Sequence, residues 1–528
     1  MGNILPIYKN KVNDNLPENY RPITLLSCMG KLFTSILSKR LNTYADQQNI
    51  LNENQGGFRS NYSTIDNIFT LHSLIELSLM LKKKMYCAFI DFKAAFDNVW
   101  RVGLWQKLIQ NGITGKCFDV IVKMYSECKS RIAVNNNFSE YFPCRIGVRQ
   151  GENLSPFLFA LFLNDVESFL ITTNNIGVST ISYEIEHELG ILLRLLIILY
   201  ADDTVLLSET PEDLQNQLNS FLLYCQKWKL EVNIEKTKIV IFTKGRMKNN
   251  VFDYNGEEVE IVKNFKYLGV IFSSSGSFIQ TKKYATERAT KAMYGILKKG
   301  NQLHLSLYDQ LHLFDKIVVP ILLYGCEVWG YSNVDIIERI HVKFCKLLFH
   351  LKSSTPNYMI YGELGRVPLI VHIKTRIIAY WLTIIHGKQS KYCYIMYSLL
   401  YAKYVNGKES KWLKNLKSIL DDSGYSNIWM NNQVVNHDWL IKSLKQKLTD
   451  QFQQNWESIC NNSSKGVIYK LFTNLDFRCQ PYVNCNLSNY MKQVLARFRT
   501  SNHKLPIETG RWNDIKRRNR LCNLCKRD

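Results

Sequence analysis

The chain has 528 residues, of which 46% are hydrophobic and 12% aromatic, a composition that excludes a disordered chain and predicts a globular protein of roughly two to four domains. Its formal net charge of +22 at pH 7 favours a polyanionic partner, nucleic acid before membrane, over a merely basic surface. No charged segment precedes an apolar run at the N-terminus, so secretion is not expected, and the 14 scattered cysteines are expected to be reduced thiols.

The apolar patterning changes along the chain and suggests four regions. The first alternates short β-rich runs with helical segments, which predicts an α+β domain. The second is mainly helical, the third is more polar and less periodic, and the last is rich in Lys and Arg. These regions are residues 1–272, 273–401, 402–491 and 492–528. The most apolar window, 189–199, is too short to span a bilayer, so no membrane partner is expected.

Two segments of the first region have clear patterns. Residues 85–90 form an apolar run that predicts a strand. Residues 155–170 predict a helix, with Ser155 as a plausible N-cap, Pro156 at its first position and apolar residues along most of its length.

Two adjacent aspartates, Asp202 and Asp203, interrupt an apolar stretch further along this region. Apolar runs at 195–200 and 205–207 flank them and predict two buried strands joined by a tight turn. Neighbouring carboxylates repel each other and resist burial, and a bound divalent cation offsets that penalty. On these residues alone, a solvated Asp-Asp turn is the alternative.

A third carboxylate, that of Asp91, follows the predicted strand 85–90 directly. Together with Asp202 and Asp203 it would supply three carboxylates from two strand ends, a suitable cage for two Mg²⁺ ions, with Mn²⁺ as a possible substitute. Such an ion pair stabilises the attacking and leaving oxygens of an in-line phosphoryl displacement. The sequence therefore predicts a catalytic metal site.

Short motifs around these aspartates follow one another in a distinctive order. They are residues 19–26 (NYRPITLL), 55–59 (QGGFR), 89–97 (FIDFKAAFD), 149–159 (RQGENLSPFLF), 200–203 (YADD), 232–238 (VNIEKTK) and 267–271 (YLGVI). The set resembles the reverse transcriptases of non-LTR, LINE-like retrotransposons, over roughly the first half of the chain. The resemblance implies a right-hand polymerase with fingers and palm in 1–272, a helical thumb after it and a basic C-terminal region.

The resemblance also implies roles for residues near the nucleotide. Phe96 falls where the family places a bulky ring against the sugar 2′ position, which would exclude ribonucleotides and imply dNTP substrates. Gln150 would hydrogen-bond the nucleotide or template, and Gly151 would let the backbone approach it closely. Tyr200, which begins the Tyr-Ala-Asp-Asp box, is counted with the substrate site. Without the resemblance, Phe96 reads as a core aromatic and Gly151 as an ordinary turn residue.

Three basic residues complete the implied site. Arg59 and Arg21 are candidates to hold the triphosphate, because a guanidinium makes forked contacts with phosphate oxygens. Lys236 matches the family lysine that protonates or neutralises the leaving pyrophosphate. A solvent-facing side chain is the alternative for each of the three. Asp97 is left out of the metal set, since it can cap or salt-bridge locally.

Partners and location follow from the same resemblance. An RNA template, a DNA primer or target and dNTPs are the expected partners, and the cytoplasm and nucleus are the expected compartments; no oligomeric state is indicated. Similar elements carry an endonuclease domain and a full zinc knuckle, whereas this chain begins within the fingers and has Cys522-Asn523-Leu524-Cys525 followed by three residues at its end. We therefore expect a truncated copy or an incomplete gene model, in which Cys522 and Cys525 are free thiols.

Two other functions fit parts of the sequence. An RNA-copying RNA polymerase would share the palm, but Phe96 and the Tyr-Ala-Asp-Asp turn argue against it. A catalytically inactive remnant that only binds nucleic acid would keep the basic surface, and the intact carboxylates argue against that.

Overall fold

The computed structural model describes residues 1–9, 13–179, 194–245, 250–431, 436–463 and 466–521. The chain forms two compact units: unit 1 comprises Met1–Ser277 and Gly387–Ser410, and unit 2 comprises Phe278–His386 and Lys411–Asp528. Unit 1 mixes helices and strands, so the predicted α+β class is confirmed there. The four regions expected from the sequence stay a prediction about functional domains.

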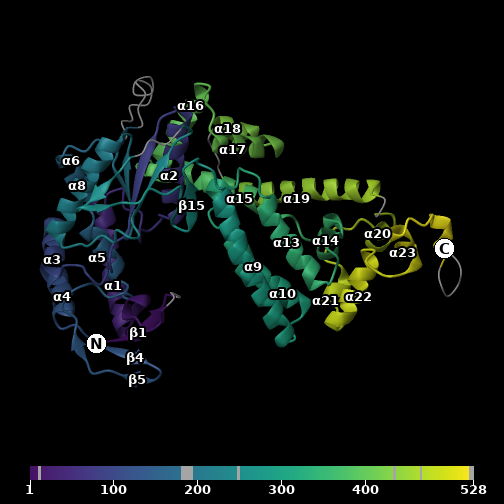
Figure 1. Cartoon of the computed structure of the whole chain (residues 1–528), viewed down its shortest axis with the longest axis horizontal. Coiled ribbons are helices and arrows are strands. Elements are labelled where there is room, and N and C mark those ends of the chain that lie inside the picture. Colours follow the sequence, from purple (N-terminus) through teal and green to yellow (C-terminus); the bar gives the residue numbers. More distant parts are fainter. Residues whose placement is uncertain (10–12, 180–193, 246–249, 432–435, 464–465, 522–528) are drawn as a thin grey trace. The chain divides into compact units, whose positions relative to one another are not determined.

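A four-stranded antiparallel sheet forms the centre of unit 1 (Figure 1). Its strands, in spatial order, are β11 (Lys238–Phe242), β3 (Met85–Ile90), β10 (Asp203–Ser208) and β9 (Ile197–Tyr200). All six residues of β3 are buried because protein covers both faces of the sheet. On one face Phe89 stacks on Phe265 with ring centroids 4.3 Å apart.

Helices cover the other face and join it in one hydrophobic core. They include α3 (Arg101–Gln110), α4 (Gly115–Ser126), α5 (Ser155–Phe162), α6 (Val166–Thr172) and α8 (Pro211–Trp228). Alternate sheet residues such as Ala88 and Leu206 lie in this core, as the period-2 pattern of a strand requires. Burying so much apolar surface is the main stabilisation of the unit.

A second sheet lies near the N-terminus, with the order β2-β1-β4-β5 and β6 paired to β4. Its strands are β1 (Gly2–Tyr8), β2 (Tyr20–Leu25), β4 (Lys129–Val134), β5 (Asn137–Phe138) and β6 (Phe142–Pro143). Helix α1 (Cys28–Gln47) follows β2, and Ser27 caps it by accepting a hydrogen bond from the Gly30 N–H. Among the described residues, six strands of two to four residues pair elsewhere: β7 (Val178–Ser179) with β8 (Arg194–Leu195), β12 (Asp253–Tyr254) with β13 (Glu257–Glu258), and β14 (Asn264–Tyr267) with β15 (Val270–Ser273).

Helix α2 (Thr64–Met80) is buried over nearly its whole circumference. A Ser63–Asp66 capping box starts it. Helix α16 (Tyr392–Val405), which is far away in sequence, packs against it within unit 1. Lys391 lies at this contact, 3.5 Å from Asp66, and is only 6% exposed. Residues 387–410 are therefore part of the folded core of unit 1.

The helix predicted at 155–170 is broken in the structure. Helix α5 ends at Phe162 and α6 begins at Val166. Between them the Asn164 side chain accepts from the Asn52 N–H and donates to the Ile50 carbonyl, both at 2.8 Å. The N-cap is Leu154 rather than Ser155, and the Ser155 hydroxyl contacts Tyr125 and Glu152 instead.

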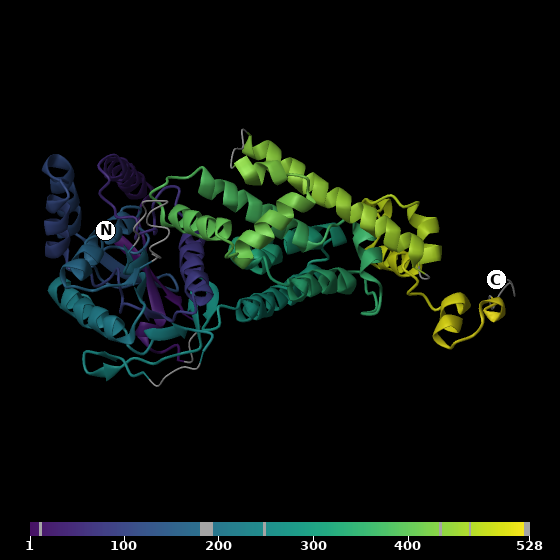
Figure 2. The same cartoon turned by 90° about the horizontal axis from the view of Figure 1, so that it is seen from above.

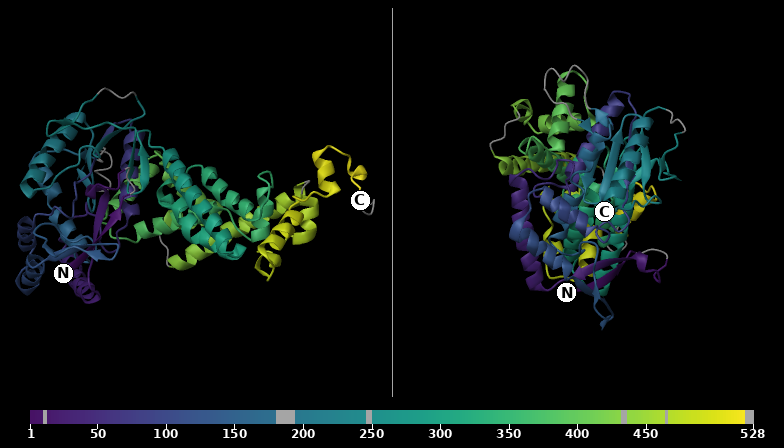
Figure 3. Two further views of the ribbon diagram at one scale, coloured as in Figure 1. Left: turned by 60° about the horizontal axis from the view of Figure 1, so that its bottom comes forward. Right: turned by 90° about the vertical axis from the view of Figure 1, so that its left-hand side faces the viewer.

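Unit 2 consists of helices in the part of the chain described here, apart from one isolated β-bridge between Leu364 and Cys479 (Figures 2 and 3). Helix α9 packs against α13, and α15 against α19. The longer helices are α9 (Ile279–Gln302), α13 (Asp335–Leu348), α14 (Asn357–Leu364), α15 (Leu369–Ile385), α17 (Lys411–Asp422), α19 (His437–Asn462), α20 (Gly466–Thr473) and α22 (Asn489–Arg499). The shorter ones are α10 (Leu307–Leu313), the π-helical turn Phe314–Val318, α11 (Val319–Leu323), α12 (Cys326–Trp329), α18 (Ser426–Asn431), α21 (Pro481–Asn484) and α23 (Pro506–Trp512).

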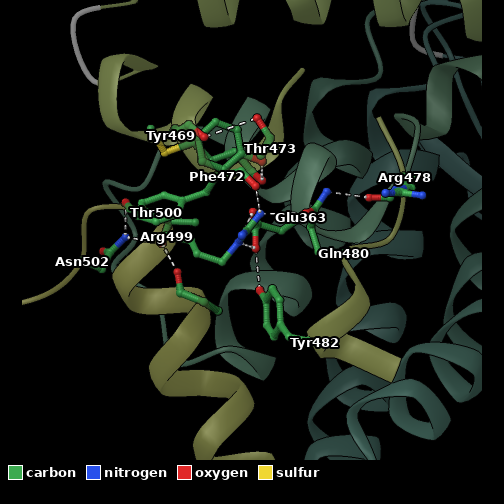
Figure 4. A network of polar contacts seen from close by, with 12 residues as sticks. Glu363, Tyr469, Phe472, Thr473, Arg478, Gln480, Tyr482, Arg499, Thr500 and Asn502 are labelled. Carbon is green, nitrogen blue, oxygen red and sulfur yellow. Dashed lines mark hydrogen bonds and ion pairs between the residues drawn. The ribbon is translucent and has the colours of Figure 1, made fainter. Parts of the chain in front are cut away.

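A buried carboxylate, that of Glu363, ties the late helices of unit 2 to α14 (Figure 4). It accepts hydrogen bonds from Arg499 Nε at 2.9 Å and from the Tyr482 hydroxyl at 2.6 Å. Arg499 also donates to the Gln480 side chain at 2.7 Å. The region 492–528 is thus not wholly a free basic tail, since this arginine belongs to a buried ion pair.

One apolar stretch, Ser155–Thr172, meets the length and composition of a membrane-crossing helix, and 61% of it is buried inside unit 1. A bent pair, Asn357–Leu364 with Leu369–Ile385, passes the same test only if its two helices, which meet at 72°, count as one span.

Candidate active site

Strand register brings the predicted aspartates together. Thr204 of β10 pairs with Ile90 of β3, so Asp203 and Asp91 are opposed at the next position. Asp203 also pairs with Tyr200 across the β9–β10 hairpin, which confirms the predicted strand–turn–strand unit. Asp202 lies in the turn itself. The two strand ends therefore present three carboxylates at one edge of the sheet.

Residues 232–238 hold Asp91 in place. The Asp91 N–H donates to Thr237 Oγ1 at 3.2 Å, and its carbonyl accepts from the Asn233 N–H at 2.7 Å. The Lys236 ammonium lies 3.0 Å from Asp91 Oδ2, in an ion pair whose side chains are 56% and 39% exposed. Lys236 thus lies beside Asp91, and its expected role toward the leaving pyrophosphate stays a prediction.

Loss of solvent and neighbouring negative charge raise the pKa of both hairpin carboxylates. Partial loss of solvent raises the pKa of Asp202; the charge of Asp91 adds to this, and Arg21 and Lys236 oppose it. The pKa of Asp203 rises to about 6, mainly through loss of solvent and then through the charges of Asp202 and Asp91. Negative charge has accumulated here beyond what the nearby cations neutralise.

The donor set fits a hard divalent cation in its chemistry. All three groups are carboxylates, the ligands that Mg²⁺ prefers, and a bound cation would favour their charged forms. Among the described residues, however, no three His, Cys, Asp or Glu side chains are gathered closely enough to hold an ion as they stand. Lys236 supplies the positive charge beside Asp91 instead. The carboxylates are neighbours rather than a preformed cage.

A cleft of about 1320 Å³ lies in front of these carboxylates, lined entirely by unit 1. Seven of the ten residues expected at the site line it: Arg21, Asp91, Phe96, Gln150, Gly151, Asp202 and Lys236. Asp203 and Tyr200 are not among the residues that line it; they pair with each other at the facing ends of β10 and β9. The cleft is large enough for a nucleotide.

An aromatic cluster fixes the Phe96 ring in the cleft. Phe96 stacks on Phe159 of α5 with centroids 4.7 Å apart and planes 18° apart. Phe58 meets Phe96 edge-on at 6.3 Å and is 49% exposed. No role for Phe58 follows from the sequence pattern, although the residue lies within the QGGFR motif. Phe96 is neither freely mobile nor wholly buried.

Gln150 and Gly151 lie against the protein's own backbone and side chains. Gln150 Nε2 donates to Asp97 Oδ2 at 3.0 Å, and the backbone carbonyl of Gln150 accepts from the Thr24 N–H at 2.8 Å. Gly151 has φ +105°, and a Cβ there would lie 2.7 Å from the Thr24 carbonyl oxygen. Glycine is needed here for the close approach of β2. Its expected approach to nucleotide or template stays a prediction.

Arg59 is not in the cleft, contrary to the sequence-based expectation of a phosphate contact. Its guanidinium donates to the Asn52 carbonyl at 2.8 Å, lies 3.6 Å from Glu53 and lies over the Tyr62 ring at 4.1 Å. The side chain is 6% exposed. Its forked donor geometry braces the loop 52–62 instead.

Comparison with known proteins places this site in a family. Residues 7–272 match the model of the family described as reverse transcriptase (RNA-dependent DNA polymerase). The chain belongs to the reverse transcriptase family. The match runs from the end of β1 into β15 and includes every residue of the candidate site. Family membership and the mixed helix-and-sheet structure fit a right-hand polymerase fold, with the four-stranded sheet as its palm.

The reverse transcriptase relatives include proteins of mobile elements. The chain is 28% identical over 351 residues to the probable RNA-directed DNA polymerase from transposon BS of Drosophila melanogaster, covering 65% of this chain and 37% of that protein. It is 26% identical to the polymerase from mobile element jockey of the same species, covering 68% and 38%. To the Pol polyprotein from element R2 of Popillia japonica it is 27% identical, covering 66% and 47%. The chain thus spans less than half the length of these relatives.

A solved structure is similar at a lower level. Apo telomerase from Candida tropicalis aligns with a TM-score of 0.34 and 12% identity, over 84% of this chain and 68% of that one. The terminal Cys522 and Cys525 of the reverse transcriptase chain lie outside the described residues.

Proposed function

We propose that the chain is the RNA-directed DNA polymerase of a non-LTR retrotransposon. It would add dNTPs to a primer 3′-hydroxyl on an RNA template, with pyrophosphate as the leaving group. The observation that carries the proposal is the strand register that opposes Asp91 and Asp203, with Asp202 in the cleft of a reverse transcriptase. Of the predicted thumb region 273–401, residues 278–386 belong to unit 2 and would form the thumb, and the net charge of +22 suits a nucleic-acid partner.

Asp91, Asp202 and Asp203 would hold two Mg²⁺ ions, or Mn²⁺ in their place. When bound, such ions stabilise the attacking and leaving oxygens of an in-line phosphoryl transfer. Arg21 lines the same cleft and interacts electrostatically with Asp202, so its guanidinium is placed to orient the triphosphate.

The Lys236 ammonium is held by a weak, exposed ion pair with Asp91. Its ion pair with Asp91 is exposed, and exposed pairs contribute only about 0–1 kcal/mol. The ammonium can therefore leave Asp91 and neutralise or protonate the departing pyrophosphate.

Phe96 would select the sugar. Its ring is held between Phe159 and Phe58, so it cannot swing aside without losing the stack. A fixed ring next to the 2′ position would exclude ribonucleotides and leave dNTPs as substrates. Gln150 lines the cleft and donates its side-chain N–H to Asp97, and its side-chain carbonyl oxygen would accept a hydrogen bond from nucleotide or template. The expected place of action is the cytoplasm and nucleus.

Primer extension on an RNA template with dNTPs and Mg²⁺ tests the proposal. Asp202→Asn should abolish extension, while Asp119→Asn, the same change on an exposed face of α4, should retain it. Wild-type chain that binds RNA in a salt-sensitive manner without extending primers would indicate the inactive remnant. Equal use of rNTPs and dNTPs would indicate an RNA polymerase.

A further inference from the structure

The turn that carries the two aspartates is tied to a distant loop by one glutamine. Gln55 Oε1 accepts hydrogen bonds from the Ala201 N–H at 3.0 Å and from the Gly57 N–H at 2.9 Å. Ala201 immediately precedes Asp202. Both donors are backbone N–H groups, so the accepting atom must be the amide oxygen rather than the nitrogen.

The glutamine is enclosed and the loop is pressed against the turn. Gln55 is 0% exposed and Ala201 is 5% exposed, so neither N–H–oxygen contact competes with water. A Cβ on Gly57 would clash with the Ala201 backbone nitrogen, which means that only glycine permits this approach. The backbone of the loop therefore lies directly against the backbone of the turn.

Backbone pairing reinforces this contact along β9. The Gly56 N–H donates to the Leu199 carbonyl at 2.9 Å, and the Leu199 N–H donates to the Asn54 carbonyl at 2.8 Å. Gln55 and Leu199 form a parallel bridge. Asn67 Nδ2 of α2 adds a third bond, to the Leu199 carbonyl at 2.9 Å. Residues 54–56 thus act as a short extra strand on the outer edge of the palm sheet.

The loop is itself anchored, so it can serve as a fixed reference. Asn52 donates two hydrogen bonds to Asn164 in the break between α5 and α6, one from its backbone N–H and one from its side-chain amide. Asn54 Nδ2 donates to Glu167 Oε2 at 3.0 Å. Arg59 donates to the carbonyls of Asn52 and Gln55. The arginine expected to bind phosphate is one of the groups that hold the loop.

Ala201 needs such support because of its conformation. Its φ is +57°, in the left-handed region that disfavours any residue with a Cβ. Residues in such conformations persist where their surroundings over-determine them. Without the Gln55 oxygen, a buried N–H would lose its partner and the turn could relax. Asp202 and Asp203 would then move relative to Asp91.

We propose that Gln55 is a positioning residue for nucleotidyl transfer: its amide oxygen fixes the Ala201 turn and thereby the placement of Asp202 and Asp203 against Asp91. The inference rests on the proposed function for its consequence in catalysis, but the structural step can be measured without catalysis. Gln55 touches no reacting group; it acts through the turn.

Three variants of the full chain test this proposal. Gln55→Met keeps the length of the side chain and removes the acceptor. Gln55→Glu keeps an oxygen in the same place. Gln217→Met is the matched control: Gln217 is also 0% exposed and donates to the Leu207 carbonyl of the neighbouring strand β10 at 2.8 Å, away from the turn.

The first readouts are single-turnover dNTP incorporation and primer–template affinity. Gln55→Met should lower the incorporation rate constant about a hundredfold, the typical consequence of a displacement near 1 Å, with primer–template affinity within threefold of wild type. The incorporation rate constant of Gln55→Glu should be at least tenfold higher than that of Gln55→Met. Gln217→Met should destabilise the protein similarly yet keep the rate constant within threefold. Equal losses in the two Met variants, or none in Gln55→Met, would overturn the proposal.

Two further readouts do not depend on activity. Amide hydrogen exchange of the peptide spanning 197–203, and Mn²⁺ affinity measured by EPR, should report faster exchange and at least tenfold weaker binding in Gln55→Met only. If the wild-type chain extends no primer, the polymerase proposal fails while these measurements still decide the role of Gln55. Unchanged exchange and Mn²⁺ affinity would refute it.

Discussion

Glu167 offers a test of how unit 1 responds to pH. This carboxylate lies on α6, where it accepts a hydrogen bond from Asn54 at 3.0 Å and a second from Tyr392. Burial raises its pKa to about 7 from an ordinary value of 4.5, and the two hydrogen bonds only partly oppose that rise. The Glu167 carboxylate therefore connects the loop that carries Gln55 to the segment 387–410. Because it is buried there, its ionised form is disfavoured.

The sign of the pH effect follows from the direction of the shift. Below about pH 4.5 both the folded and the unfolded states carry the proton, and the group has no effect on stability. Between about 4.5 and 7 the unfolded chain loses the proton while the folded chain keeps it, so each pH unit lowers the free energy of unfolding by up to about 1.4 kcal/mol. Above about pH 7 the full penalty, on the order of 3 kcal/mol, is present.

Glu167→Gln removes the titration and keeps a side chain that can accept from Asn54 and donate to Tyr392. At pH 5 its melting temperature should be close to that of the wild type, and at pH 8 it should be higher by roughly 5–10 °C. The exposed Glu127→Gln at the end of α4 serves as control and should show no such pH-dependent gain. An unchanged difference between pH 5 and pH 8 would refute the assignment of a raised pKa to Glu167.

Other predictions concern the cleft. Phe96→Ala should raise rNTP use relative to dNTP use at least tenfold, measured as the ratio of incorporation efficiencies; an unchanged ratio would count against the sugar gate. Arg21→Ala should raise the KM for dNTP about tenfold, whereas Arg59→Ala should lower the melting temperature and leave that KM within threefold; the reverse pattern would restore Arg59 as the phosphate ligand. Because the pKa of Asp203 is raised to about 6, Mg²⁺ binding at pH 6 should release protons and be weaker than at pH 8. Calorimetry in buffers of different ionisation enthalpy measures this release, and Asp203→Asn should reduce it.

Local patterns in the sequence were sufficient for the elements that carry the aspartates. The run 85–90 is the strand β3 from Met85 to Ile90, and the two runs around Asp202 and Asp203 are the hairpin β9–β10. Apolar side chains there alternate or run continuously because the strands are buried, so burial leaves its period in the sequence. The motif order further identified the family and most of the residues that line the cleft.

Only the tertiary structure decided what the polar residues near these elements do. Arg59 and Gln55 belong to one motif, yet the arginine braces a loop and the glutamine accepts from the Ala201 turn, 146 residues away. A helix pattern at 155–170 could not reveal that Asn164 would pair with Asn52 and break it. A polar side chain has the same local pattern whether it meets solvent, substrate or a backbone N–H from a distant strand. Its partner is set by long-range packing, which the sequence near it does not record.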